Sequence, residues 1–256
     1  MQKEAWIHSL AALILGAFAL LLRWLQDITI FEEETGLAVA GAAISRLYTL
    51  LILLSILALW VLCRRLKGCT AQTEPELALY GAPKGLGALL AVSALVAGLG
   101  CALLYFTGAG LFVKVTALLG LLSLPALLLF PSLPRWGGLG AFLTLFPVVF
   151  FGAWMISAYR SYAVNPVVWS YAPLILAIAS LLLAVYHLSA YLFYRAKPAE
   201  TVFVCSVAPL FCLSVVVDDL DLSVRLIAAG WALGLVGLVW LLVRNMSPLL
   251  PAEDED

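Results

Sequence analysis

The chain has 256 residues, of which 64% are hydrophobic and 11% are charged, and its formal net charge is −1 at pH 7. Soluble domains carry about 25% charged residues, so this chain lacks the polar side chains that would cover a water-exposed surface. The composition therefore excludes an ordinary soluble domain, and without a basic stripe it gives no indication of nucleic-acid binding. It predicts a membrane protein whose solvent is lipid.

Eight hydrophobic segments are long enough to cross a bilayer, which takes about 20 apolar residues in a helix. The first has no small-residue cleavage site and is longer than the hydrophobic region of a signal peptide, so we expect it to be retained. The sequence thus predicts an all-α fold, a polytopic integral membrane bundle of about eight helices in a single domain. The expected spans are residues 5–25, 44–63, 85–105, 111–130, 139–159, 167–194, 199–217 and 226–243.

The sixth span is the longest, and it has no charged side chain between residues 167 and 194. Asn165 and Pro166 mark its start, because proline suits the first turn of a helix. Tyr186 and His187 lie in its last third, at a depth where polar side chains usually face other helices rather than lipid. The histidine could serve a proton relay or contact a ligand, or it could be a neutral histidine bonded to a neighbouring helix.

Four consecutive spans contain a proline, which frees a backbone carbonyl and can bend a helix. These residues are Pro125, Pro147, Pro173 and Pro209. Because proline is common in membrane helices, and no interrupted span is short enough to be a half-helix, we expect bends and not a binding site. Between the second and third spans, Thr73-Glu74-Pro75-Glu76 predicts a capping box and a short surface helix that ends near Tyr80.

The distribution of the 14 lysine and arginine residues sets the expected orientation, since cytoplasmic loops are rich in them. With the N-terminus inside, nine cations lie on the cytoplasmic side and five on the outer side. We therefore expect a multi-pass protein of the bacterial plasma membrane with both termini in the cytoplasm, ending in an acidic disordered tail over residues 248–256.

The five outer cations all lie at helix ends, close to acidic residues of the outer loops. If they converge, they form a polar pocket for an anionic solute or a lipid headgroup; if they point apart, they anchor the helices at lipid phosphates. Together with nearby polar residues and the two aromatic residues of the sixth span, they define the candidate polar pocket. Its members are Arg23, Arg46, Lys114, Arg160, Asn165, Tyr186, His187, Asp218, Asp219 and Arg225.

Two further patterns concern helix packing. Gly230, Gly234 and Gly237 lie on or near one face of the last span, and this spacing allows another helix to approach closely, within the chain or in a homodimer. Residues 1–131 and 135–247 place cations at similar positions, which favours a parallel repeat of four spans, although interfacial cations recur in any polytopic protein.

No GxxxxGK[ST], HExxH or GxSxG motif is present, so we expect no enzyme, no metal and no cofactor. The five cysteines show neither CxxC nor disulfide spacing and are interpreted as small buried or cytosolic thiols. The segment FEEETGL, and the stretch from Arg160-Ser-Tyr-Ala-Val-Asn-Pro through Tyr186 to Lys197-Pro198, resemble polytopic membrane proteins of anaerobic Firmicutes. That family has no assigned activity, so the resemblance implies the topology and no function.

Two functional hypotheses remain open. The first is a permease-like protein, or one that binds a small solute or lipid. The second is a non-transporting membrane partner, such as an assembly or sensory subunit. The first predicts a water-accessible cavity lined by Arg160, Asn165 or His187; the second predicts a dry core and an exposed face of small residues.

Overall fold

The computed structural model describes residues 2–30, 43–70, 74–162 and 168–248, and it confirms an all-α bundle with eight helical segments long and apolar enough to span a membrane. The protein is a multi-pass membrane protein. The long helices are α1 (Gln2–Ile30), α2 (Ala43–Arg64), α4 (Lys84–Thr107), α5 (Leu111–Leu129), α6 (Gly138–Leu143) with α7 (Leu145–Tyr162), α8 (Val168–Leu192), α9 (Pro198–Val215) and α10 (Leu222–Arg244). We call the end where α1 begins and α10 ends the N-terminal end, and the opposite one the far end.

The expected spans agree with these helices except in detail. The fifth span is divided at Thr144 into α6 and α7, with Pro147 in the first turn of α7. Proline has no N–H to donate to the carbonyl of Leu143, so the helix cannot continue regularly through this point. The fourth span continues beyond α5 into a 3₁₀ segment, η2 (Phe130–Trp136).

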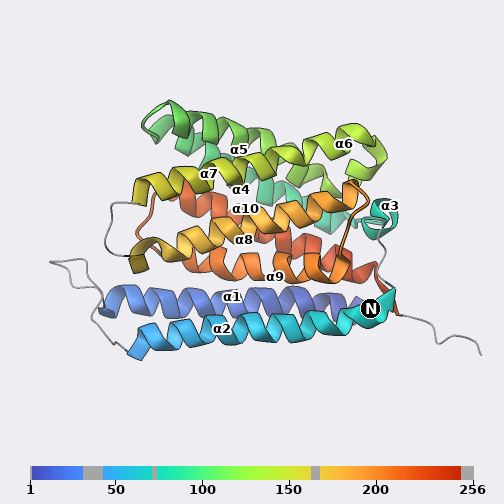
Figure 1. The fold of residues 1–256 in the computed structure, drawn as a ribbon, viewed down its shortest axis with the longest axis horizontal. Coiled ribbons are helices and arrows are strands. Elements are labelled where there is room, and N and C mark those ends of the chain that lie inside the picture. The colour runs from blue at the N-terminus through green and yellow to red at the C-terminus, as the bar shows by residue number, and fades with distance from the viewer. Residues whose placement is uncertain (1, 31–42, 71–73, 163–167, 249–256) are drawn as a thin grey trace, which may run out of the picture.

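The last two helices form the centre of the bundle (Figure 1). In their membrane-spanning segments 78% of the residues of α10 and 72% of those of α9 are buried, against 28–39% for the five spans that precede α8. α10 packs against α1, α4 and α9, and α9 packs against α1, α2 and α8. α1 and α2 lie along one side of this centre, and α5 and α7 lie on the other.

The glycines of α10 face α4, and they bring the two helices into close contact. A Cβ atom on Gly230 would lie 2.5 Å from the backbone nitrogen of Ala97, and one on Gly234 would lie 2.6 Å from Oγ of Ser93. The Ser93 hydroxyl donates a hydrogen bond to the Gly230 carbonyl. The close approach therefore occurs within the chain.

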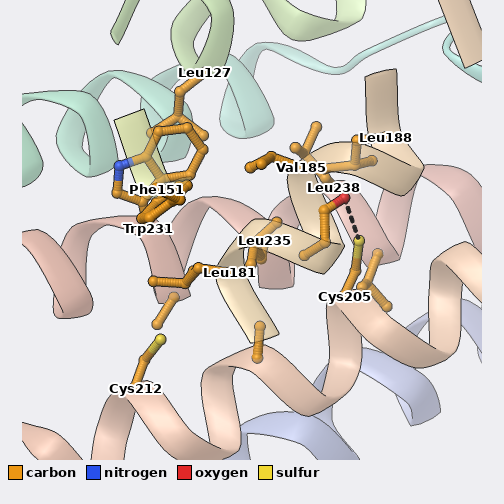
Figure 2. Close-up of a cluster of buried hydrophobic side chains, with 14 of the residues drawn as sticks. Leu127, Phe151, Leu181, Val185, Leu188, Cys205, Cys212, Trp231, Leu235 and Leu238 are labelled. Carbon is orange, nitrogen blue, oxygen red and sulfur yellow. Dashed lines mark hydrogen bonds between the residues drawn. The ribbon is translucent and has the colours of Figure 1, made fainter. Parts of the chain in front are cut away.

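An aromatic and aliphatic cluster fills the space between α7, α8, α9 and α10 (Figure 2). Phe151 and Trp231 meet edge to face with ring centroids 5.0 Å apart, and Phe150 and Trp154 stack beside them. The four cysteines whose side chains are described are buried and free, in agreement with their interpretation as buried thiols: Cys63, Cys101, Cys205 and Cys212.

At the N-terminal end, the connection after α2 packs against the end of α10 and forms hydrogen bonds with it. It comprises η1 (Arg65–Gly68), β1 (Cys69–Thr70) and α3 (Pro75–Ala78), and β1 pairs with β2 (Ser247–Pro248). The Asn245 amide donates hydrogen bonds to the carbonyls of Ala78 and Tyr80. The chain is thus ordered to Pro248, and the rest of the predicted tail lies outside the described residues.

The predicted capping box is wrong. The N-cap of α3 is Glu74, which makes no side-chain cap hydrogen bond, and Pro75 occupies the first helical position. Thr73 lies outside the described residues. The surface helix itself is present because proline is pre-organised for a first turn.

In a parallel repeat α7 is the counterpart of α1 and α8 the counterpart of α2, and both α1–α2 and α7–α8 are in contact. α8 also packs along α9, and α2 packs against α9 as well. A parallel repeat would give both halves the same internal neighbours. The repeat stays a prediction.

We expect Gly230→Ala to destabilise the protein by about 1–3 kcal/mol, because the new methyl group meets backbone atoms of α4. Gly152→Ala on α7 is the matched control, since a Cβ there meets no atom within 4 Å. Melting temperatures in detergent test this expectation. A Gly230→Ala variant as stable as Gly152→Ala would contradict the close packing of α10 on α4.

Candidate functional site

The ten residues of the candidate polar pocket do not form one site. Five lie at the far end beside α1, α2 and the α9–α10 turn: Arg23, Arg46, Asp218, Asp219 and Arg225. Lys114 and Arg160 also lie at the far end, but on α5 and α7, on the other side of the central helices. Tyr186 and His187 lie near the N-terminal end of the bundle, and Asn165 lies outside the described residues.

A buried ion pair joins α1 to the turn after α9. Nε of Arg23 donates to Oδ1 of Asp218 at 2.6 Å, and the side chains are only 2% and 3% exposed. The turn directs Asp218 inward because its N–H bonds to the carbonyl of Val215 and its own carbonyl accepts from Leu220. The next residue, Asp219, is fully exposed.

A hydrogen-bond network extends from this pair to α2. Nη1 of Arg23 donates to Oε1 of Gln26 at 3.1 Å, and Nε2 of Gln26 donates to Oγ of Ser45 at 3.1 Å. The guanidinium also lies 5.9 Å from the ring centre of Tyr48, whose hydroxyl is hydrogen-bonded to the Ser214 side chain. The site thus ties α1, α2 and α9 together through polar groups.

The carboxyl of Asp218 has a pKa that lies close to neutral pH. Burial raises its pKa to about 6, and Asp27 adds to the rise, although the charge and hydrogen bond of Arg23 and the charge of Arg225 oppose it. Burying a charge is costly unless its partners satisfy every lone pair. Oδ2 of Asp218 is buried and has no hydrogen-bond partner among the described residues, so it is the atom that can take a proton.

A second polar feature at the far end is a cavity of about 430 Å³ between α5 and α7. Ser157, Arg160 and Ser161 line it from the end of α7, and residues 109–113 line it from the start of α5. The first turn of a helix has backbone N–H groups without helical acceptors, and no side chain caps those of α5. Lys114 does not line the cavity, and its amine lies 6.0 Å from the ring centre of Tyr105.

The expectation that Tyr186 faces the bundle is wrong. Its side chain is 59% exposed, on the outer surface of α8, and His187 beside it is half-buried. The buried face of this turn is formed by Leu188 and Tyr191 instead. Tyr186 therefore faces lipid or the membrane interface, where the amphipathic ring of a tyrosine is stable.

Sequence reasoning missed the neutral partners of the far-end sites. Gln26 lies three residues after Arg23, a helical spacing that indicates a shared face, and Ser157 lies three residues before Arg160 and four before Ser161. Ser45, Tyr48 and Ser214 gave no such signal. Among the residues described, no three His, Cys, Asp or Glu side chains gather as metal ligands.

No protein-family model matches the chain, and no curated protein and no solved structure matches it. The resemblance to polytopic proteins of anaerobic Firmicutes therefore stays a prediction. The function is therefore inferred from the arrangement of residues at the far end.

The raised pKa of Asp218 predicts that stability falls as pH rises through about 6. The protonated carboxyl, favoured in the folded state, contributes stability that is fully present below its ordinary pKa of about 3.9 and is lost above the folded-state pKa. The melting temperature in detergent should fall between pH 5 and pH 7.5, by the equivalent of about 1.4 kcal/mol, because only about one pH unit of the pKa rise lies within this window.

Asp218→Asn, which mimics the protonated carboxyl, should flatten this pH dependence. Asp219→Asn is the matched control, because the neighbouring carboxyl is fully exposed, and it should keep the wild-type slope. If Asp218→Asn keeps the wild-type slope as well, Asp218 is not the titrating group.

Proposed function

We propose that the protein is a permease-like membrane protein that binds a small anionic solute at the far end of the bundle. The observation that supports this function is the 430 Å³ cavity in which Arg160 and two serines face the start of α5. With both termini in the cytoplasm of a bacterial plasma membrane, as the distribution of cations favours, this cavity opens to the outside.

The lining of the cavity suits an anion better than a cation. The exposed Arg160 guanidinium supplies a positive charge that no carboxylate pairs with among the described residues, and the helix dipole adds a partial positive charge at the start of α5. The hydroxyls of Ser157 and Ser161 supply further donors. A phosphate or carboxylate group can accept hydrogen bonds from all of these groups.

The Arg23–Asp218 pair supports a permease in a different way. Protonation of Oδ2 removes the cost of burying the carboxylate charge, so the contact between α1 and the α9–α10 turn is more stable when Asp218 is protonated and weakens as the carboxyl ionises. A change of pH at the far end can thereby bias the position of α1 and α2 relative to α9. A helix contact whose strength depends on protonation is the kind of two-state element that proton-coupled carriers need.

The alternative is a non-transporting membrane partner, and the tightness of the interior favours it. The hollow beside Trp231, in the middle of the bundle, has a volume of only about 10 Å³, which is about the space of one water molecule. The glycines of α10 do not support this alternative further, because α4 already covers them. A permease would have to open this interior by moving helices, whereas a partner protein would not.

Single cysteines at Ser157 and Ser161 in a cysteine-free background test the solute site. We expect a membrane-impermeant thiol reagent to label both from the far side, because both line the open cavity. Inorganic phosphate or succinate should slow the labelling several-fold, and Arg160→Gln should remove that protection. Uptake of the protective anion into proteoliposomes should fall with the same variant.

Lys114→Gln is the matched control, because Lys114 lies in the first turn of α5 but does not line the cavity. This variant should leave the protection unchanged. Labelling that neither anion slows would contradict a soluble-anion site. Protection without any uptake would favour the non-transporting partner.

A further inference from the structure

An apolar groove opens on the bundle at its N-terminal end, away from both polar sites. It has a volume of about 630 Å³, within the range of about 300–1,000 Å³ that small-ligand pockets occupy. α10 forms its floor, because it packs against both α1 and α4, and the start of α4 and the start of α1 form its walls. From Trp6 to Leu13 along α1 the groove extends roughly 10 Å into the membrane.

The wall of the groove is apolar except for one hydroxyl and two indole N–H groups, and the N–H of Trp240 is buried without a hydrogen-bond partner among the described residues. The one hydroxyl that lines it, that of Ser9, donates its hydrogen bond to the carbonyl of Val236 at 3.2 Å. The other lining side chains are leucines, a valine, a proline and two tryptophans, Trp6 and Trp240, with two glycines between them. Hydrocarbon suits the apolar side chains that make up most of this wall, because a polar ligand would lose its hydrogen bonds to water there.

The rim of the groove is different, because it carries cations. Lys84 follows Pro83 and precedes Gly85, which both line the groove, and its side chain is exposed. The Arg244 guanidinium lies 5.2 Å from the ring centre of Trp240, and it gives one hydrogen bond to the carbonyl of Gly81. Among the described residues, no carboxylate lies within ion-pair distance of either cation.

The two tryptophans connect the apolar wall to the charged rim. Their ring centroids lie 5.7 Å apart, one ring on α1 and the other on α10, so the two rings are in contact where they line the groove. Tryptophan is enriched at the depth of lipid headgroups, where its ring contacts the acyl chain region below and the polar region above. The groove therefore lies in one leaflet, with its rim at the headgroups of that leaflet.

We propose that this groove binds an anionic phospholipid of the leaflet at the N-terminal end. An acyl chain lies on α10 between α1 and α4, and the phosphate contacts Lys84 and Arg244. In a membrane an apolar groove does not select a lipid by hydrophobicity, because every lipid tail is equally apolar. The two cations select it by charge, as basic pockets between membrane helices do.

Native mass spectrometry of the full-length protein in detergent, titrated with phosphatidylglycerol and with phosphatidylcholine, tests the proposal. Each cation near an anionic lipid contributes about fivefold in affinity, so the wild type should prefer phosphatidylglycerol by more than about fivefold at its first site. Lys84→Gln and Arg244→Gln should each reduce this preference about fivefold. Among the described residues the exposed Lys84 side chain makes no hydrogen bond and no ion pair, so we expect its replacement to leave the fold intact.

The control for charge is Arg64→Gln. Arg64 lies at the same end, and its guanidinium lies 4.2 Å from the ring centre of Trp60, but it does not border the groove. The control for shape compares two glycines of α4 that both have open space around a Cβ. Gly85→Leu fills the groove and should weaken the binding of both lipids. Gly87 does not line the groove, so Gly87→Leu should leave the binding of both lipids unchanged.

Equal affinity of the wild type for the two lipids would overturn the proposal. So would a loss of preference in Arg64→Gln as large as that in Arg244→Gln, because the selection would then reflect the overall charge of this end. Unchanged lipid binding in Gly85→Leu would show that the lipid sits elsewhere. None of these outcomes depends on the anion site at the far end.

Discussion

The close contact between α10 and α4 is the interaction on which the bundle depends. Helices in lipid gain no hydrophobic free energy by associating, so they are held by van der Waals contact and by hydrogen bonds between them. At Gly230 the backbones of α10 and α4 touch, and the Ser93 hydroxyl bonds across the contact. With α10 fixed on α4, its other sides are available to α1 and α9, and the remaining helices assemble around this core.

The charged side chains that the structure describes lie toward the ends of the bundle, away from the close contact of α10 and α4. The interior between α7 and α10 is filled by aromatic rings such as Phe151 and Trp231, and serines within the helices donate to carbonyls of their own turn. Among the described residues, the buried ion pair lies at the far end, where Arg23 and Asp218 join α1 to the turn after α9, whereas the Lys197–Glu200 pair at the other end is exposed. A contact between charged groups depends on their protonation, whereas a contact between methyl groups does not. This end of α1 therefore responds to pH changes that leave the core unchanged.

The sequence predicted the spans and the close-packing face well, because both follow from local constraints. A helix must contain about 20 apolar residues to cross the bilayer, and the spacing of Gly230 and Gly234 defines a groove on any helix. It could not predict that Arg23 meets Asp218, since 195 residues separate them and the order of helices around the bundle is not a local property. It also misplaced Tyr186, because α8 is apolar on all sides and hydrophobicity does not distinguish its lipid face from its buried face.

The far-end cavity and the apolar groove at the N-terminal end differ in their lining, as their different surroundings require. At the far end, Arg160 and the start of α5 present donors to a cavity that opens toward water, where only a charged or strongly polar ligand repays the loss of hydration. At the N-terminal end, Trp6 and Trp240 enclose a groove open to hydrocarbon, and charge appears only at its rim. α10 forms the floor of the groove, and α1 carries both one wall of it and Arg23, so the proposed lipid site and the buried ion pair share a single helix.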